Sequence, residues 1–174
     1  KDTVAHAYVY YSNPDTANPC DAYVPFTLTT ITITKEVHIT RYAIAGIYYI
    51  KYVYIPKTVK TIGFAAFSYD YALLKIGITG EEDKHLESCF LPSNLTTIYE
   101  AAFYRCESFV SIVIPNSVTS MEYRIFAYCY NVTDLTVPFI GTSRTATGSE
   151  GLLSYMFAEM DAGGDRTLST RLPG

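Results

Sequence analysis

Tryptophan is absent from this sequence, histidine occurs three times, and charged residues make up only 17% of the chain. The net charge is −4 and no run of basic residues occurs, which argues against a nucleic-acid partner and against a polybasic membrane patch. No apolar stretch reaches the roughly 18 residues of a transmembrane helix, so we expect no membrane insertion. A signal peptide is not expected either, because Lys1 leads directly into polar, tyrosine-containing sequence.

Sequence patterns that carry chemistry are also lacking. The chain has four cysteines, Cys20, Cys89, Cys106 and Cys129. They form no CxxC pair, and no histidine lies at metal-ligand spacing from any of them. The three histidines, His6, His38 and His85, are scattered along the chain. The repeat places no second metal ligand and no carboxylate beside any of them. No Gly-rich phosphate loop, nucleophile elbow or zincin motif occurs. We therefore predict no catalytic residue, no cofactor and no metal site, and expect that the chain is not an enzyme.

The chain is rich in apolar residues, at 49%, and it contains 17 tyrosines. Over 174 residues this composition is globular and allows one domain with a sizeable buried core. The tyrosines have two interpretations. Tyrosine combines a rigid apolar ring with a polar tip, so a tyrosine-rich surface can bind partners and stay hydrated. Alternatively, a repeat simply multiplies the residue type found at each of its positions.

A repeat of about 23 residues organises the chain, and prolines mark it at Pro92, Pro115 and Pro138. Thr79 takes the proline position that comes one unit after Pro56. Six apolar positions agree across three units, at 3, 6, 11, 17, 20 and 22 residues after the marker: Val59, Leu95 and Val118; Ile62, Ile98 and Met121; Phe67, Phe103 and Phe126; Leu73, Phe109 and Val132; Ile76, Ile112 and Leu135; Ile78, Ile114 and Val137.

A fourth unit lies upstream, between Pro25 and Pro56, and is eight residues longer than the others. When the eight extra residues are assigned to an insertion after Leu28, the apolar residues of this unit fall at the same repeat positions as in the other units: Ile39, Ile44, Ile50, Val53 and Ile55. The inserted part, residues 29–34, alternates threonine and isoleucine over most of its length, which predicts one extra short strand.

We divide the chain into three parts. Residues 1–24 form an irregular N-terminal segment, interpreted as the end of a preceding array. Residues 25–138 form a solenoid of four units, with an insert at 79–91: 25–55, 56–78, 92–114 and 115–137. Residues 139–174 form an irregular segment that leads towards a further array, with a short helix at 152–157 and no evident capping sequence. The similar sequence around Pro25 and Pro173 suggests a superperiod of 148 residues.

Each unit predicts the same local structure. Isoleucine and valine alternate in a strand before each proline, as in Ser111–Pro115, and the proline ends the strand. A second short extended piece follows, as at Val118–Met121. The segment after it, such as Tyr99–Cys106, fits a single helical or 3₁₀ turn that drops Phe103 into the core. One unit cannot bury its own apolar positions, so the units must stack as a solenoid.

Two runs carry a resemblance to a known family: residues 102–115, AFYRCESFVSIVIP, and residues 114–121, IPNSVTSM. They resemble the BspA-type, or Treponema-type, leucine-rich repeat, whose pattern reads approximately IPxSVTxIGxxAFxxCxxLxxIxIP. The resemblance implies an α/β repeat protein, a leucine-rich-repeat-like solenoid with short strands and short helical or 3₁₀ turns. The sequence departs from the pattern at three places. Ile47 and Asp70 stand at the Cys position, Thr79 stands at the Pro position, and Met121 with Glu122 replaces the Ile-Gly pair.

The resemblance also implies a function, and the sequence leaves alternatives open. It implies a non-enzymatic extracellular or cell-surface module for adhesion, which binds protein on a host or neighbouring cell. An alternative is a structural spacer, stalk or fibre subunit that self-associates end to end, supported by the superperiod and by open solenoid ends. A third hypothesis is a scaffold domain attached to an enzyme elsewhere in a longer chain.

Outward-facing residues are the candidate protein-binding sites. A tyrosine-rich ridge is expected along one edge of the solenoid: Tyr48, Tyr69, Tyr71, Arg105, Tyr128 and Tyr130. A second candidate is the exposed face of the strands: Tyr52, Tyr54, Lys75, Ser111 and Asp134. An ordinary polar surface is the alternative for both. In the core, Cys106 and Cys129 share a position in stacked units, about 5 Å apart, which fits either a disulfide or two buried thiols.

Overall fold

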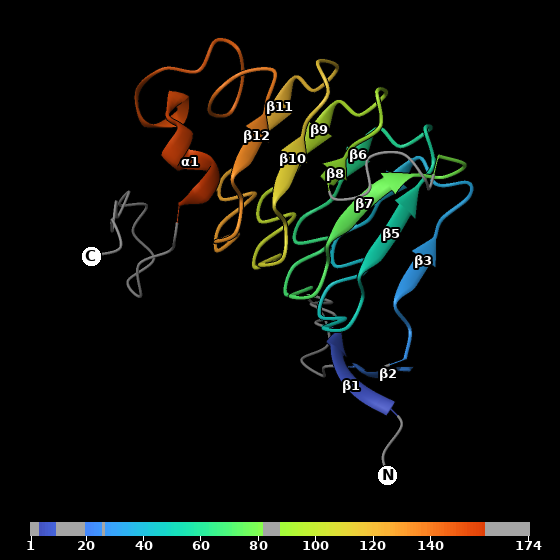
Figure 1. The fold of residues 1–174 in the computed structure, drawn as a ribbon. Coiled ribbons are helices and arrows are strands. Elements are labelled where there is room, and N and C mark those ends of the chain that lie inside the picture. Colours follow the sequence, from blue (N-terminus) through green and yellow to red (C-terminus); the bar gives the residue numbers. More distant parts are fainter. Residues whose placement is uncertain (1–3, 10–19, 26, 82–87, 159–174) are drawn as a thin grey trace.

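The computed structural model describes residues 4–9, 20–25, 27–81 and 88–158. Figure 1 shows stacked coils with a small antiparallel hairpin near the N-terminal end and two short helices near the C-terminal end. The hairpin and helices are β1 (Val4–Val9), β2 (Cys20–Pro25), η1 (Gly148–Gly151) and α1 (Leu153–Phe157). Neither of these helices has the length or apolar character needed to cross a bilayer. The coils confirm the predicted fold class, a repeat solenoid of short strands and short turns.

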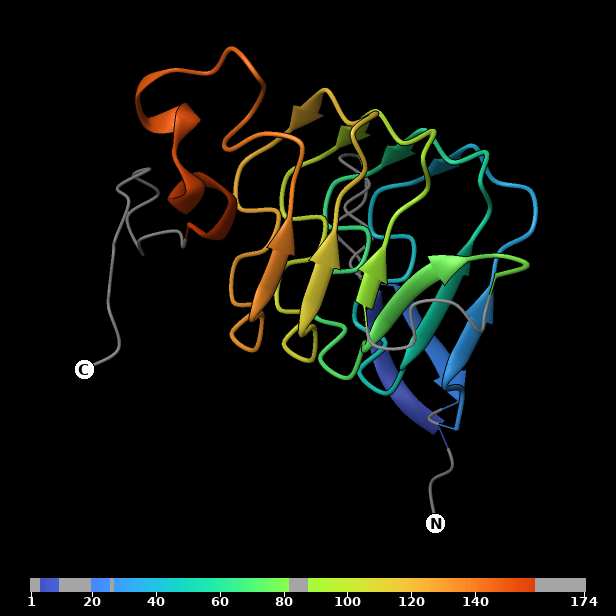
Figure 2. The ribbon, with the colours of Figure 1, turned by 45° about the horizontal axis from the view of Figure 1, so that its top comes forward.

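Parallel strands line two faces of the solenoid (Figure 2). In the described residues, the first face carries six strands in two hydrogen-bonded groups: β3 (Thr30–Thr32), β5 (Tyr52–Ile55) and β7 (Lys75–Ile78), then β8 (Ser88–Phe90), β10 (Ser111–Val113) and β12 (Asp134–Thr136). The second face carries shorter strands: β4 (His38–Ile39), β6 (Thr61–Ile62), β9 (Thr97–Ile98) and β11 (Ser120–Met121). We number the coils 1 to 4 after the units 25–55, 56–78, 92–114 and 115–137.

The strand register follows the repeat. Ile112 pairs with Leu135 and Val53 with Ile76, so each residue lies opposite the equivalent position of the next unit. All the predicted apolar positions of coils 2 and 3 are buried. In coil 4, the last three are only half-buried, because they lie in or beside β12, the outermost strand of the first face: Val132, Leu135 and Val137. The predicted extra strand is confirmed as β3, which places Ile31 opposite Val53.

The insert at 79–91 supplies a further strand that the sequence analysis did not predict. Its last part, β8, pairs with β10 and places Cys89 opposite Ile112. The other faces are continuous across the insert, because β6 pairs directly with β9, and the rings of Phe67 and Phe103 stack at 5.5 Å between centroids. The first face therefore gains a strand that the second face lacks. The charged stretch 82–85 lies outside the described residues.

Consecutive turns form the third face, and their backbone hydrogen bonds alternate in direction. In coil 3, the N–H groups of Ala101, Phe103 and Arg105 donate to coil 4 at 2.9–3.1 Å. The N–H groups of Ala102 and Tyr104 donate instead to the carbonyl three residues back, at 3.3 and 2.9 Å, which is the hydrogen bond of a 3₁₀ turn. Left-handed backbone at Ala101 and Arg105 (φ 56° and 59°) keeps the segment from continuing as a helix.

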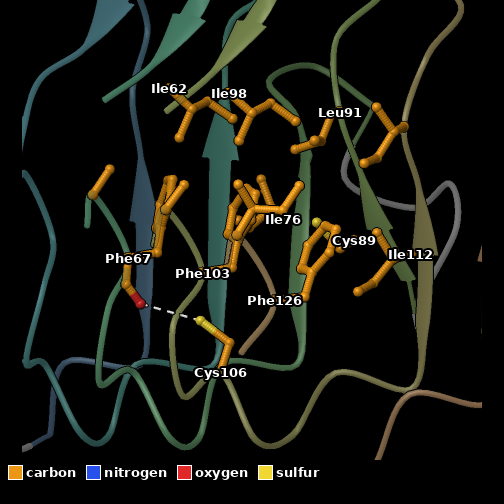
Figure 3. Packing of buried hydrophobic residues seen from close by; sticks show 14 of the residues in the cluster. Ile62, Phe67, Ile76, Cys89, Leu91, Ile98, Phe103, Cys106, Ile112 and Phe126 are labelled. Atoms are coloured by element: carbon orange, nitrogen blue, oxygen red, sulfur yellow. Dashed lines mark hydrogen bonds between the residues drawn. The ribbon is translucent and has the colours of Figure 1, made fainter. Parts of the chain in front are cut away.

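A column of phenylalanine rings fills the centre of the solenoid (Figure 3). Phe103 stacks on Phe67 at 5.5 Å and on Phe126 at 5.4 Å, with interplanar angles of 14° and 11°. Phe109 meets the edge of Phe103 at 6.1 Å, and all four side chains are fully buried. Because each ring touches its neighbours in adjacent coils, the column ties the coils together.

Residues 139–158 cover the outer side of coil 4. The N–H groups of Arg124 and Phe126 donate to the carbonyls of Tyr155 and Met156, each at 2.9 Å, as they would to a further coil. Met156 is fully buried, and α1 confirms the short helix predicted here. The expectation that no capping sequence is present is therefore wrong for the turn face. β12 remains an edge strand in the part of the chain that the structure describes.

Candidate functional site

Tyrosine rings form a continuous line across the four coils, on the turn face. Successive ring centroids lie 5.1–6.2 Å apart, in the order Tyr48, Tyr71, Tyr69, Tyr104, Tyr128 and Tyr130. We call these six tyrosines and Arg105 the tyrosine ridge. The structure brings together all the residues that the sequence places in this ridge. The most exposed are Tyr130, Tyr69 and Tyr48, at 65%, 41% and 37%, and the others are half-buried.

Tyr104 is the ridge residue that the sequence analysis missed. Its neighbours at the same repeat position are Ser68 and Ala127, so no aromatic pattern marks it. Its ring nevertheless joins Tyr69 in coil 2 to Tyr128 in coil 4, at 5.2 and 5.1 Å. A search for aromatic residues directly beside the exposed repeat positions would have found it, because Tyr104 precedes Arg105 in the chain.

Left-handed backbone directs three ridge side chains outward. Tyr69, Arg105 and Tyr128 share one repeat position and have φ values of 64°, 59° and 62°. This conformation costs a residue other than glycine about 1–2 kcal/mol. Coil 1 has Gly46 at the same position, with φ 78°, so glycine satisfies the fold there without that cost.

Arg105 is the cation of the ridge. Its guanidinium carbon lies 4.4 Å from the ring centroid of Tyr128, and its Nη1 lies 3.4 Å from a carboxylate oxygen of Glu107. Burial raises the pKa of the Tyr69 hydroxyl above its ordinary value, and the neighbouring Tyr104 raises it further, so this hydroxyl is neutral at physiological pH. The ridge thus combines aromatic rings and hydroxyls with the guanidinium of Arg105 and the carboxylate of Glu107, a combination suited to binding protein.

The predicted strand face offers less accessible surface. Asp134 is exposed, whereas Tyr52, Tyr54 and Ser111 are half-buried. The expectation that Lys75 is exposed is wrong, because its side chain is only 1% accessible. The absence of a side chain at Gly77 leaves room for the lysine side chain. A Cβ at Gly77 would lie 2.9 Å from Cε of Lys75, so the aliphatic part of the lysine packs against the backbone of Gly77. The ammonium lies 5.3 Å from the ring centroid of Tyr54.

The cysteines and histidines form no chemical site in the described residues. Cys89, Cys106 and Cys129 are buried free thiols, so of the two alternatives for Cys106 and Cys129 the structure has the unbonded one. Nδ1 of His38 lies 2.9 Å from the Thr61 hydroxyl. No group of three potential metal ligands occurs in this part of the chain.

The buried thiols should resist alkylation in the folded protein. In a Cys20→Ser variant, a maleimide pulse at pH 8 should modify no thiol, because burial raises the pKa of Cys129 to about 12 and shields the three sulfurs from the reagent. Mass spectrometry after the same pulse in urea should show three adducts. Modification faster than the measured rate of global unfolding would contradict this burial.

Comparison with known proteins gives a family match and three similar structures. The family model for the BspA type leucine rich repeat region matches six copies over residues 22–74 and 81–146, well over half of the chain. No curated protein matches the chain. A leucine-rich repeat protein from Bacteroides ovatus is similar at 28% identity and a TM-score of 0.55, with 71% of this chain and 30% of that chain covered.

Two further solved structures are similar at lower identity. A leucine rich repeat protein from T. pallidum has 22% identity and a TM-score of 0.47, with 63% of this chain and 53% of that chain covered. A leucine rich cell surface protein from Faecalibacterium prausnitzii has 17% identity and a TM-score of 0.46, with 79% and 39% covered. The chain thus spans between 30% and 53% of the length of the three proteins.

Proposed function

Because the chain belongs to the BspA-type leucine-rich repeat family, we propose that it is a non-enzymatic module that binds protein through the tyrosine ridge. In repeat solenoids, most of the repeated residues form the core, and partners bind along an extended outer surface. The proposal includes an extracellular or cell-surface location and a partner on a host or neighbouring cell, as the family resemblance implies.

The observation that carries the proposal is the backbone conformation of two ridge residues. Tyr69 and Tyr128 occupy a left-handed position where Gly46 is found in coil 1. Glycine there would relieve about 1–2 kcal/mol of strain at each site. A second left-handed position of the turn holds Tyr42, Ala65, Ala101 and Arg124; there Ala65 and Ala101 are buried in the core, and Tyr42 and Arg124 are half-buried. Tyr69 is largely outside the core, so a role at the surface accounts for keeping a tyrosine at a strained position.

Removal of the two strained tyrosines should weaken binding strongly and preserve the fold. We expect Tyr69→Gly plus Tyr128→Gly to weaken the binding of purified extracellular proteins about 10-fold or more, since buried tyrosines are frequent hot spots of interfaces. Stability should change little, because relief of backbone strain offsets lost ring contacts of about 0.5–1.5 kcal/mol each. Surface plasmon resonance on a panel of immobilised extracellular proteins measures the first effect, and thermal unfolding the second.

A matched control is available on the same molecule. Tyr99 is 40% exposed and lies outside the ridge, so Tyr99→Ala should bind like the unmodified protein. A strand-face variant, Tyr52→Ala plus Asp134→Ala, tests the competing surface. The ridge proposal is wrong if the strand-face variant loses binding while the ridge variant keeps it, or if no protein of the panel binds saturably.

End-to-end association as a spacer or fibre is a second candidate. It is favoured by one observation: β3 and β12 are the edge strands at the two ends of the first face, in the described residues. The cover that residues 139–158 place over coil 4 opposes it on the turn face. Growth in apparent mass with concentration on size-exclusion chromatography would favour this candidate, and a concentration-independent monomer would exclude it.

A further inference from the structure

Asp70 occupies a buried position that cysteine fills in the next two coils. The thiols of Cys106 and Cys129 each donate a hydrogen bond to a phenylalanine carbonyl of the preceding coil, at 3.1 and 3.2 Å. Coil 2 has Asp70 at this repeat position, and the equivalent carbonyl in coil 1 belongs to Ile44. In coils 3 and 4, then, this position supplies a hydrogen-bond donor from inside the core to the neighbouring coil.

A carboxyl at this position can donate a hydrogen bond only when it is protonated. Oδ1 of Asp70 accepts a hydrogen bond from the N–H of Ile47 in coil 1, at 2.8 Å, and the residue is fully buried. Its Oδ2 is also buried and has no hydrogen-bond partner among the described residues. A carboxylate can only accept, whereas a carboxylic acid has one O–H to donate. Protonation would therefore turn the unpartnered oxygen into a donor like the cysteine thiols.

Neutral groups surround this carboxyl. Coil 1 contributes the N–H groups of Gly46 and Ile47, coil 3 contributes the Cys106 thiol, and Asp70 has no ion-pair partner in the described chain. Burial raises the pKa of Asp70 well above its ordinary value, and the two N–H groups lower it by less. The phenols of Tyr69 and Tyr71, beside Asp70 in sequence, stay protonated in the same pH range because burial raises the pKa of each.

Asp70 is adjacent in the chain to residues at one end of the tyrosine ridge. Tyr69 and Tyr71 flank it in the sequence, and Tyr48 follows Ile47, whose N–H the carboxyl binds. The rings of Tyr48 and Tyr71 meet at 5.4 Å. The contact between Asp70 and Ile47 therefore joins coil 1 to coil 2 at the place where these rings must pack.

We propose that Asp70 is a neutral carboxylic acid in the folded protein, and that its protonation keeps the Tyr48–Tyr71 end of the ridge assembled. Because the folded-state pKa exceeds the unfolded value of about 3.9, the folded protein binds more protons. The stabilisation is fully present below about pH 4 and is lost as pH rises through the folded-state pKa. The effect on partner binding rests on the proposed function, whereas the titration and the ring contact do not.

The test compares the unmodified chain with Asp70→Asn and Asp70→Cys in urea unfolding from pH 4.5 to 9. Asparagine keeps an acceptor and a neutral donor at every pH, and cysteine restores the residue of coils 3 and 4. We expect the urea midpoint of each variant, relative to the unmodified chain, to increase as pH rises. The ring-to-ring nuclear Overhauser effect between Tyr48 and Tyr71 should weaken over the same range in the unmodified chain and persist in the variants.

A difference in midpoint that does not change with pH would overturn the proposal. If both variants fail to fold, the ¹³C resonance of the Asp70 carboxyl in the unmodified chain decides the question. A neutral-acid shift at pH 6 supports the proposal, and titration near pH 4 overturns it. Where a ridge partner is found, pH-independent binding contradicts this inference but leaves the proposed function intact. If no partner binds, the proposed function fails and the titration still tests Asp70.

Discussion

Phe103→Ala should destabilise the protein by about 3–5 kcal/mol, the range found when a fully buried phenylalanine is truncated. The ring is fully buried and stacks on Phe67 and Phe126 at 5.5 and 5.4 Å. Its removal leaves a cavity between coils 2 and 4 that rigid neighbouring coils cannot close. Urea unfolding followed by far-UV circular dichroism measures the loss.

Two further variants show whether the effect belongs to the column. Tyr99→Ala removes an aromatic ring that is 40% exposed and should cost less than about 1 kcal/mol. In the double variant Phe67→Ala plus Phe103→Ala, the second truncation should cost less than it does alone, because the stacking contact is already gone. A loss for Phe103→Ala no larger than that for Tyr99→Ala would mean that the column does not hold the coils together.

The sequence predicts the fold well because the same positions are buried in each unit. Six apolar positions recur from unit to unit, and stacked coils must place equivalent positions side by side. The strand β3 was predictable for the same reason, since residues 29–34 alternate as a half-buried strand does. Apolar periodicity identifies what enters the core, so predictions about the core succeed.

The insert and Lys75 show where periodicity stops being informative. Within residues 79–91, only the short run that contains Cys89 enters the first face, and too few residues alternate to reveal a strand. Alternation along β7 places Lys75 on the outer face. Its burial depends on Gly77 and on the ring of Tyr54, which belongs to a different coil. A pattern within one strand carries no information about that neighbour.

The candidate site was predicted in part. The ridge residues follow from two exposed repeat positions, but the left-handed backbone of Tyr69, Arg105 and Tyr128 does not, because tyrosine and arginine rarely adopt it. Tyr104 joins the ridge through contacts between coils rather than through a repeated residue type. The buried carboxyl of Asp70 was visible only as a departure from cysteine, and its chemistry needed the position of Ile47.

Gly141→Ala should release the cover over coil 4. Gly141 has φ 86°, and a Cβ there would lie 1.9 Å from the carbonyl oxygen of Glu150 and 2.8 Å from Cα of Gly151. Both are backbone atoms, so the chain must move apart. The displaced segment includes Thr142, whose carbonyl accepts from the N–H of Met121 at 2.9 Å. We expect the free energy of unfolding to fall by about 4 kcal/mol or more, because release of the cover would also expose buried side chains.

Gly148→Ala separates the steric effect from backbone strain. Gly148 also has positive φ, 61°, but a Cβ there meets nothing within 4 Å, so this variant should lose only about 1–2 kcal/mol. Limited proteolysis with mass spectrometry should then show early cleavage within residues 139–158 for Gly141→Ala alone. Met156 is fully buried and Phe126 donates to its carbonyl, so release of this segment would also open the end of the phenylalanine column. Equal stability losses and equal cleavage in the two variants would mean that residues 139–158 lie on coil 4 without stabilising it.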